Sequence, residues 1–496
     1  MTLTPEIMAP LMFAGLIVFM LLGYPVAFSL AGLGLFFGIV GIEAGLFEVS
    51  LLQALPERVF GILSNELLLA IPFFTFMGAV LERCGLAEDM LEGLGQLFGP
   101  VRGGLAYAVI IVGAILGAIT GTVAASVIAM GLISLPAMMR YGYNMRLATG
   151  VIAASGTITQ LIPPSLVLVI LADQLGRSVG DMYKGAFGPS LVQVLLFCAF
   201  VFILTIVKPH HAPPLPRDAR TASVGAIVWR CAKGIVPSLI LIFLVLGTIF
   251  LGLATPTEAG AMGAVGAMVL AAAHRRLTWT LLNQGMSTTM RITAMVIFIL
   301  IGSNVFGLVF RGVNGDLWIE HLLTSLPGGV TGFLIFVNIF VFVLAFFLDF
   351  FEIVFIIVPL LAPVAAKLGI DLIWFGVLLG ANMQTSFMHP PFGFALFYLR
   401  GIAPKEVKSS DIYWGAIPWV FMQLILVAII IAWPELVLSM VDTPAAVDPA
   451  TYDLQIPEGE AAPEEAPSED GAPKEGEGAA DDPAKAIERA IQSGKP

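Results

Sequence analysis

The sequence contains very little charge. Lys, Arg, Asp and Glu make up 12% of its 496 residues, whereas hydrophobic residues make up 58%. A water-soluble globular domain carries about 25% charged residues, so this composition excludes an ordinary soluble fold. Apolar runs of roughly 17–25 residues, long enough to cross a bilayer, recur along the chain. We therefore predict an all-α protein that crosses the lipid bilayer many times.

Cysteine and histidine are scarce too. The three cysteines, Cys84, Cys198 and Cys231, lie in or beside apolar runs without metal-ligand spacing, which indicates neither a disulfide nor a metal centre. The sequence lacks the Gly-x-Ser-x-Gly, His-Glu-x-x-His and P-loop motifs. No basic stretch interleaved with aromatic residues suggests nucleic acid. We predict no enzyme activity, no cofactor and no nucleic-acid partner.

Negative charge is concentrated near the C-terminus. The formal net charge is −11, and the residues from Asp442 onward contain fourteen Asp and Glu against four Lys and Arg. The rest of the chain is therefore close to neutral. Residues 441–496 consist mainly of Ala, Pro, Glu, Gly and Asp, which cannot bury a hydrophobic core. We predict a disordered acidic tail over this range.

One stretch of the chain occurs twice. Residues 136–164 align with residues 363–391 at an offset of 227, without a gap. The matched positions include Gly142 with Gly369, Asn144 with Asp371, and Pro163-Pro164 with Pro390-Pro391. A proline inside an apolar run removes a backbone hydrogen bond and breaks the helix. At membrane depth such a break is tolerated where it lines a cavity or holds a ligand, so we expect two functional broken helices.

The duplication divides the chain into four segments. Residues 1–207 form a first repeat, 208–234 a basic linker, 235–440 a second repeat, and 441–496 the acidic tail. The basic residues of the linker place it in the cytoplasm by the positive-inside rule, and the basic cluster His274-Arg275-Arg276 returns to the same side two apolar runs later. If the repeats are related by inversion, both termini lie on the periplasmic side.

Oxygen-bearing side chains accompany two breaks in apolar runs. The first group is Thr120-Gly121-Thr122 with Ser126, and the second is Asp349 with Glu352. Hydroxyls, a carboxylate and unwound carbonyls suit a hard cation such as sodium. Small polar residues can instead serve close helix packing. A carboxylate inside the membrane is costly, which makes Asp349 a functional candidate.

Three further polar features are open to more than one interpretation. His389, before the second proline pair, is either a packed residue, a ligand contact or a proton-coupling group. Ser64-Asn65 and Ser287-Thr288-Thr289 interrupt apolar runs at comparable places in the two halves. They are either the tips of re-entrant hairpins or ordinary loops.

With these residues in view, the chain resembles the large membrane subunit of tripartite ATP-independent periplasmic (TRAP) transporters up to about residue 440. The resemblance is carried by six segments: Leu-Leu-Ala-Ile-Pro-Phe-Phe (68–74), Gly-Tyr-Asn-Met-Arg-Leu-Ala (142–148), Gly-Thr-Ile-Thr-Gln-Leu-Ile-Pro-Pro-Ser (156–165), Ala-Thr-Pro-Thr-Glu-Ala (254–259), Phe-Leu-Asp (347–349) and Pro-Pro-Phe-Gly (390–393). It implies two inverted repeats, each with a re-entrant helical hairpin and a broken transmembrane helix, moving as an elevator.

The resemblance also implies a function. Members import an organic acid with sodium as the coupling ion. The acid is delivered by a soluble periplasmic substrate-binding protein, and a small four-helix membrane subunit, expected here as a separate chain, completes the assembly in the bacterial inner membrane. The His-Pro-Pro-Phe-Gly version resembles a branch linked to 2-oxo acids and other monocarboxylates, which favours such a substrate.

Site residues follow from the same resemblance. It implies a first sodium site at Thr120, Gly121, Thr122, Thr159, Ile162 and Pro164. It implies a second at Asp349, Thr385, Ser386, His389 and Pro391. The substrate is expected between these breaks and the tip residues Ser64, Asn65, Ser287, Thr288 and Thr289, with Gln160 and Gln384. Two positions depart from the common pattern, because many members have Thr in place of His389 and Gly in place of Thr159.

Three other interpretations compete with this one. A stand-alone sodium–carboxylate symporter of the same fold would need no binding protein. An intramembrane enzyme would use Asp349, Glu352 and His389. A structural membrane scaffold gives no reason for two costly polar breaks, so the duplicated breaks argue against it.

Overall fold

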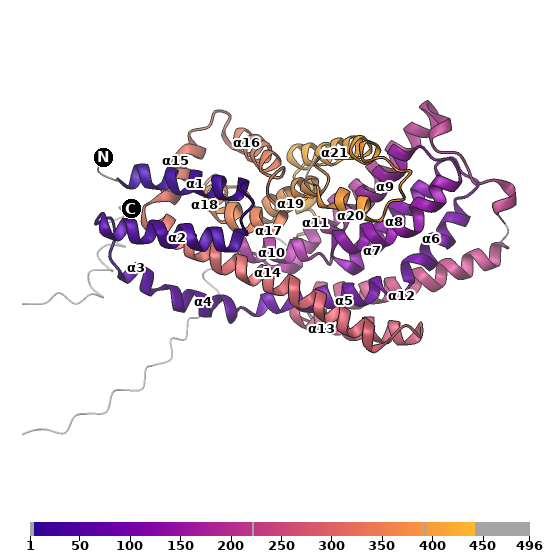
Figure 1. The fold of residues 1–496 in the computed structure, drawn as a ribbon, viewed down its shortest axis with the longest axis horizontal. Helices are drawn as coiled ribbons and strands as arrows, with labels where there is room; N and C mark the ends of the chain where they lie inside the picture. The colour runs from indigo at the N-terminus through magenta and orange to yellow at the C-terminus, as the bar shows by residue number, and fades with distance from the viewer. Residues whose placement is uncertain (1–3, 221–222, 391–392, 442–496) are drawn as a thin grey trace, which may run out of the picture. The chain divides into compact units, whose positions relative to one another are not determined.

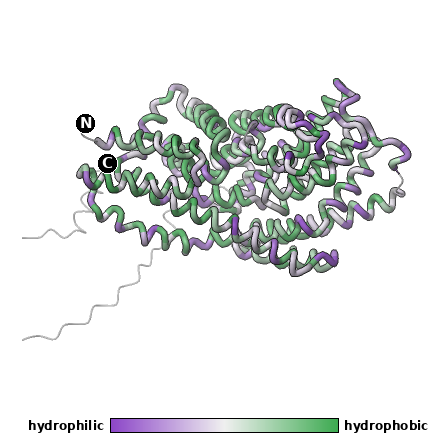
Figure 2. The backbone as a smooth tube through the Cα atoms, viewed as in Figure 1, coloured by the Kyte–Doolittle hydropathy of each residue, from purple (hydrophilic) through white to green (hydrophobic). Residues whose placement is uncertain are grey.

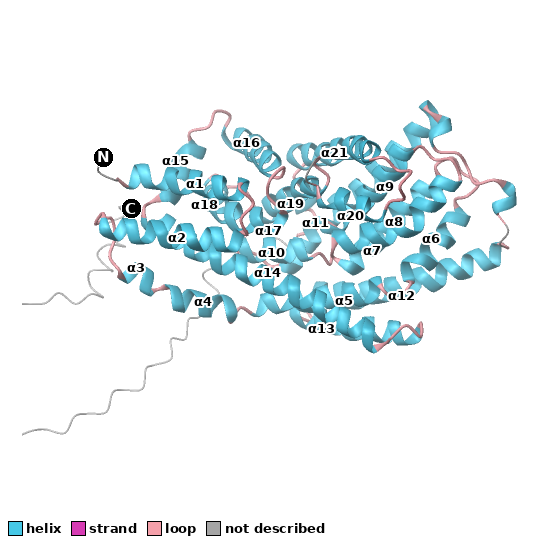
Figure 3. Ribbon diagram, viewed as in Figure 1, coloured by secondary structure: helices cyan, strands magenta, loops and turns pink. Residues whose placement is uncertain are grey.

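The computed structural model describes residues 4–220, 223–390 and 393–441, and within these ranges it contains helices and turns but no strand (Figure 3). Eight of the described helices are long and apolar enough to cross a membrane, and the number rises to ten if two bent helix pairs each count as one span. Hydrophobic residues extend along most of these helices (Figure 2). The predicted all-α, multi-spanning architecture is confirmed. The predicted tail lies outside the described residues except for Val441.

The helices of the first half run from α1 to α11. Their bounds are α1 (Pro5–Leu21), α2 (Val26–Glu43), α3 (Ser50–Gln53), α4 (Leu55–Leu63), α5 (Ala70–Glu82), α6 (Leu86–Leu97), α7 (Gly104–Thr120), α8 (Val123–Arg140), α9 (Met145–Thr157), α10 (Leu166–Gln174) and α11 (Val179–Val207). Short 3-10 turns precede α5 and follow α9, at η1 (Glu66–Leu69) and η2 (Ile158–Gln160). Two more, η3 (Pro209–His211) and η4 (Arg217–Ala219), lie in the linker.

The second half begins with α12. Its elements are α12 (Val224–Phe250), α13 (Pro256–Ala273), α14 (Trp279–Gly312), α15 (Gly315–Thr324), α16 (Gly329–Leu344), α17 (Phe350–Glu352), the π-helical turn η5 (Ile353–Ile357), α18 (Val358–Lys367), α19 (Leu372–Met383), the 3-10 turn η6 (Gln384–Phe387), α20 (Phe394–Ile402), α21 (Ser409–Ala432) and α22 (Glu435–Leu438). The order of α7 to α11 recurs as α16 to α21 (Figure 1).

The matched turns of the duplication have the same local structure. Asn144 precedes α9 and accepts hydrogen bonds from the backbone N–H groups of Arg146 and Leu147. Asp371, 227 positions later, caps α19 in the same way. Gly142 and Gly369 adopt φ angles of 75° and 73°, which only glycine adopts without strain. The two copies of the repeat therefore share the structure of this turn.

The two halves interlock through exchanged contacts. Helix α2 of the first half packs on α14 of the second, and α13 of the second half packs on α5 of the first. Glycines allow the close approach: a Cβ added to Gly302 in α14 would lie 2.3 Å from the carbonyl oxygen of Ala27 in α2. The described residues through Val441 belong to one compact unit, within which the two halves pack together.

Candidate functional site

Helices α7 and α8 form a hairpin whose tip is Gly121-Thr122. Helix α7 packs against α9 with Gly113 beside Ser155 and Gly117 beside Thr159, so these two helices run parallel. Helix α8 is joined to α9 by a short turn, packs along it and runs the opposite way. The chain therefore reverses between α7 and α8. Gly121 makes the reversal with a φ of 60°.

The tip of this hairpin lies against the break between α9 and α10. A Cβ added to Gly121 would lie 3.9 Å from the carbonyl oxygen of Pro164 and 3.8 Å from the nitrogen of Leu166. Within the described ranges, the carbonyls of Ile162, Pro163 and Pro164 accept no hydrogen bond. Free carbonyls of an unwound membrane helix are typical ligands for Na⁺. The structure thus brings Gly121, Thr159 and Pro164 of the first predicted sodium site together.

Helices α16, α17 and α18 form the corresponding hairpin in the second half. The ring of Phe333 stacks on that of Phe375, and Asn382 Nδ2 donates to the carbonyl of Asn338 at 2.7 Å. Both contacts join α16 to α19 in parallel, as α7 is joined to α9. Residues 345–349 form the tip of this second hairpin. Both tips thus fall at positions where the sequence showed only interruptions of apolar runs.

His389 docks the second break onto the second tip. Its ring stacks on Phe346 with centroids 4.1 Å apart and meets the edge of Phe342 at 4.5 Å. The side chain is 2% exposed, and neither ring nitrogen has a hydrogen-bond partner in the part of the chain that the structure describes. Its carbonyl accepts from Gly393 N–H at 2.7 Å. Pro391, also predicted for this site, lies outside the described residues.

Three predicted hydroxyl ligands lie in the breaks and are buried. Thr159 donates to the carbonyl of Gly156, Thr385 to that of Asn382, and Ser386 to that of Met383. Each hydroxyl oxygen keeps lone pairs, because in these bonds it serves as donor. Of the remaining predicted ligands, Thr120 is the last residue of α7. Thr122 is the residue before α8, and its side chain makes no capping hydrogen bond to that helix. Ile162 is partly exposed in the first break.

Asp349 has a structural role that the sequence did not reveal. It precedes α17 and forms a capping box: its carboxylate accepts from Glu352 N–H at 2.9 Å, and the Glu352 carboxylate accepts from Asp349 N–H at 3.1 Å. A capping box satisfies backbone donors at the start of a helix. No hydrogen bond in the described ranges joins Asp349 to Thr385 or Ser386. The carboxylate therefore lies at the tip but points to its own helix.

Two glutamines missing from the predicted set connect each break to the opposite half. Gln193 in α11 donates to Gln384 Oε1 at 2.6 Å, and Gln423 in α21 donates to Thr157 Oγ1 at 3.0 Å. All four side chains are buried. The two glutamines are 230 positions apart, the offset at which Asp181-Met-Tyr-Lys-Gly-Ala matches Asp411-Ile-Tyr-Trp-Gly-Ala, so the repeat contained the signal for them.

The same region holds several buried polar atoms without a partner among the described residues. They are Ser155 Oγ, Gln160 Oε1, Gln193 Oε1, Asn382 Oδ1, Gln384 Nε2, Gln423 Oε1 and both ring nitrogens of His389. Buried polar atoms are almost always hydrogen-bonded, so such a concentration indicates a site for a ligand, ion or water. Gln160 and Gln384, predicted to face the substrate, belong to this set.

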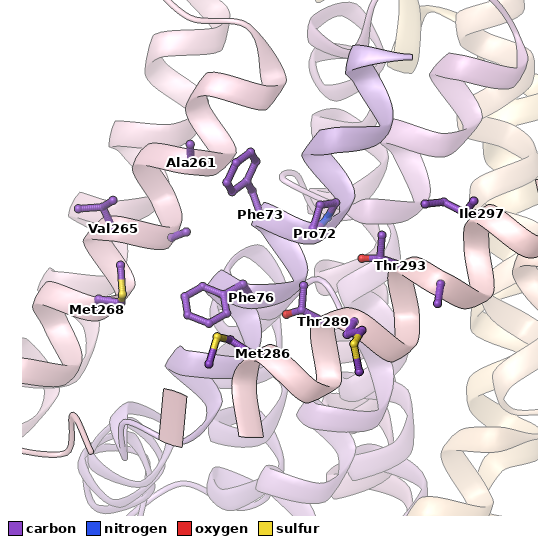
Figure 4. A pocket seen from close by; sticks show the side chains of 13 residues that line it. Pro72, Phe73, Phe76, Ala261, Val265, Met268, Met286, Thr289, Thr293 and Ile297 are labelled. Atoms are coloured by element: carbon purple, nitrogen blue, oxygen red, sulfur yellow. The ribbon is translucent and has the colours of Figure 1, made fainter. Parts of the chain in front are cut away.

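The predicted tip at Ser287-Thr288-Thr289 is wrong. These residues lie inside the unbroken helix α14, where Thr288 and Thr289 donate to the carbonyls of Gln284 and Gly285 at 2.9 Å each. A hydroxyl that bonds to the preceding turn lets a polar residue remain helical. Thr289 instead lines an apolar groove of about 680 Å³ between α5, α13 and α14 (Figure 4). With side chains such as Phe73, Phe76 and Met268, the groove does not suit an acid.

Ser64-Asn65 is also not the tip of a hairpin. The two residues form a 47° bend between α4 and the continuous pair η1–α5. Asn65 Nδ2 donates to Asp173 Oδ1 at 2.8 Å, which connects the bend to the last turn of α10. The prediction that Ser64-Asn65 forms a hairpin tip is therefore wrong, and its contact with the substrate stays a prediction.

Two hairpins facing two broken helices, within a bundle of membrane-spanning helices, define a membrane transporter. The fold is similar to that of the Alcanivorax borkumensis YdaH transporter, with a TM-score of 0.55 and 15% identity over 79% of this chain and 90% of that one. Residues 13–436 match the family described as "Tripartite ATP-independent periplasmic transporter, DctM component". The chain belongs to this family and is the large membrane subunit of a TRAP transporter.

Named relatives agree with this assignment. The C4-dicarboxylate TRAP transporter large permease protein DctM of Pseudomonas aeruginosa is 29% identical over 80% of this chain and 91% of its own length. The Vibrio cholerae protein of the same name is 29% identical over 85% and 94%. The isethionate TRAP transporter permease protein DctMQ of Oleidesulfovibrio alaskensis is 26% identical over 81% of this chain and 61% of its own length. All are named as permeases, as predicted for a chain that is not an enzyme.

Proposed function

We propose that this subunit imports a small organic acid, with a monocarboxylate such as a 2-oxo acid favoured, together with sodium ions. The observation that carries the proposal is the pairing of each hairpin tip with a broken helix. Beside this pairing, the carbonyls of Ile162–Pro164 and an array of buried polar atoms have no hydrogen-bond partner among the residues that the structure describes. Carbonyl and hydroxyl oxygens supply the ligands that Na⁺ requires, and amide groups supply donors for a carboxylate.

The proposal includes the partners and the setting. A periplasmic binding protein delivers the acid, and a small membrane subunit assembles with this chain. The relative DctMQ is a longer permease of which this chain spans 61%. The assembly lies in the bacterial inner membrane, with the two repeats inverted and both termini periplasmic. The hairpins and broken helices move past α5 and α14 as an elevator.

Uptake by reconstituted protein tests the proposal. The chain and its small subunit are placed in proteoliposomes, and uptake of radiolabelled pyruvate, lactate and succinate is measured with and without a sodium gradient and the cognate binding protein. We expect uptake of one acid that requires both. Sodium-driven uptake without the binding protein would indicate the stand-alone symporter. Uptake driven by a proton gradient alone would contradict sodium coupling.

A further inference from the structure

A second, polar cavity lies beside the C-terminal half of α14. It encloses about 270 Å³. Its lining comes from α14, from the end of α10, from the start of α15 and from the π-helical turn and α18 of the second hairpin. Its polar members are Gln174, Ser303, Asn304, Arg311 and Asp316. The cavity therefore lies where the long helix α14 meets a broken helix and a hairpin. None of the predicted site residues lines it.

Arg311 brings an uncommitted positive charge to this cavity. Its Nε donates to the carbonyl of Gly307 at 3.2 Å, and the guanidinium makes no ion pair within the described ranges. The charged groups that act on it are Arg58 and Asp316. Arg58 lies outside the cavity lining and Asp316 within it, and their opposite charges cancel, so the charge of the Arg311 guanidinium remains as the net positive charge. Such a site attracts an anion.

The remaining donors narrow the class of ligand. Ser303 already donates to the carbonyl of Phe355, and Gln174 Nε2 donates to Asp173 Oδ2 at 2.9 Å. The side chain of Asn304 makes no hydrogen bond to a described residue. A guanidinium fork and an unbonded amide in the lining of one cavity can both donate to the oxygens of a carboxylate. Asp316 in the same lining would repel a second carboxylate.

The position of the cavity agrees with the direction of import. Arg311 lies near the end of α14 that is farther from the basic cluster His274-Arg275-Arg276. By the positive-inside rule that basic cluster is cytoplasmic, so Arg311 lies toward the periplasmic side, where a binding protein would release the acid.

We propose that Arg311 and Asn304 form a carboxylate subsite for the incoming acid, selective for molecules with one carboxylate. This inference rests on the proposed function, because it assigns the entry point of the same substrate. The acid contacts Arg311 before it reaches the buried polar groups between the breaks.

Thiol labelling tests the subsite without measuring transport. Gly307 lines the cavity, and a Cβ at this position would meet only Arg311 Nη2, at 3.9 Å, so Gly307→Cys places a thiol beside the guanidinium. The full chain carrying Gly307→Cys is treated with an anionic or a cationic methanethiosulfonate, and the background of the three native cysteines is subtracted. We expect the anionic reagent to be favoured, and Arg311→Gln to lower that preference about tenfold. Lactate or pyruvate should slow labelling only when Arg311 is present.

Arg291→Gln is the matched control, because Arg291 is an exposed arginine on the same helix that does not line the cavity. It should leave both the reagent preference and the protection unchanged. The subsite would be overturned if the preference for the anionic reagent survived Arg311→Gln. It would also be overturned if lactate or pyruvate slowed labelling equally with and without Arg311. If reconstituted wild-type protein takes up no acid while the labelling pattern is as expected, the proposed function fails and the anion site stands.

Discussion

At the scale of single residues, Asp349 combines the observed capping role with a proposed ion-binding role, and substitution can separate the two. Asp349→Asn keeps an oxygen that caps α17 but removes the charge, whereas Asp349→Ala removes both. If the charge contributes to sodium binding, Asp349→Asn should raise the sodium concentration for half-maximal uptake about tenfold, equivalent to about 1.4 kcal/mol. Asp349→Ala should abolish sodium-dependent uptake and still assemble with the small subunit.

Asp371→Asn is the control for this experiment. Asp371 caps α19 with bonds of 2.8 and 2.9 Å to the N–H groups of Ile373 and Trp374, and it is exposed at a turn. Asp371→Asn therefore changes a carboxylate helix cap of the same kind, at a position outside the tip of the second hairpin. Sodium-dependent uptake should be normal. An unchanged sodium response in Asp349→Asn would show that the carboxylate serves the helix alone.

The two glutamines that contact the opposite half, Gln193 and Gln423, give a second prediction. Gln193→Leu leaves Gln384 unpaired, and Gln423→Leu leaves the Thr157 hydroxyl with one bond fewer. Gln193→Leu should destabilise the fold by about 1–3 kcal/mol, the cost of a buried polar group left without its partner. Gln423→Leu should cost about 0.5–1.5 kcal/mol, the net contribution of one hydrogen bond, because the Thr157 hydroxyl still donates to the carbonyl of Ala154. Thermal unfolding of the purified chain measures the effect.

A double-mutant cycle measures whether the residues in these bonds are energetically coupled. Gln193→Leu with Gln384→Leu should cost clearly less than the sum of the single changes, because both remove the same bond. Gln193→Leu with Gln423→Leu should be additive, since the two glutamines contact different partners. Additive effects in both pairs would show that the amide contacts contribute no coupling energy.

At the scale of secondary-structure elements, Gly121 controls the position of the first tip. Gly121→Ala and Gly142→Ala place a side chain at φ angles of 60° and 75°, so both should cost about 1–2 kcal/mol in backbone strain. A Cβ at Gly142 meets no atom within 4 Å, whereas one at Gly121 faces Pro164 and Leu166. We expect only Gly121→Ala to weaken the sodium dependence of uptake. Equal effects of the two changes on transport would argue against an ion site at this tip.

The bond between Asn65 and Asp173 offers a test of the proposed movement between elements. It joins the bend before α5 to the last turn of α10, that is, a long helix proposed to stay still and a broken helix proposed to move. A reversible crosslink between Asn65→Cys and Asp173→Cys should stop uptake, and reduction should restore it. Each single cysteine variant under the same oxidant is the control. Full uptake by the crosslinked chain would exclude movement between α5 and α10.

The elements also show what the sequence can and cannot predict. The prolines, Gly142, Asn144 and their counterparts specify local backbone structure, so the turns and both breaks could be predicted from the repeat. Ser287–Thr289 could not be distinguished from a hairpin tip by sequence. Hydroxyl residues that bond to their own helix and hydroxyl residues at a turn interrupt an apolar run in the same way. The Gln193–Gln384 and Asn65–Asp173 contacts depend on how the halves interlock, which local sequence does not specify.

At the scale of the whole molecule, the acidic tail should be dispensable for transport. Its composition of Ala, Pro, Glu, Gly and Asp cannot bury a hydrophobic core. Removal of residues 446–496 should leave the rate of acid uptake unchanged in protein present at an equal amount. A loss of more than half of the uptake would assign the tail a role in transport.

The exchanged contacts explain why the two repeats should act as one unit. Each broken segment is held by a helix of the other half, at Gln193 and at Gln423, so a movement of one break changes the surroundings of the other. Under the proposed function, sodium bound at one tip would thereby favour a state in which both breaks are ordered. The coupling of ion and acid would then arise from the fold and require no direct contact between them.

The most direct test of this account measures both fluxes in the same vesicles. Radioactive sodium and the labelled acid are followed together in proteoliposomes that contain the full assembly, with the binding protein supplied outside. The account predicts that sodium enters only when the acid and its binding protein are present, at a fixed ratio to the acid, and that Asp349→Ala abolishes both fluxes. Acid uptake at an unchanged rate without any movement of sodium would contradict it.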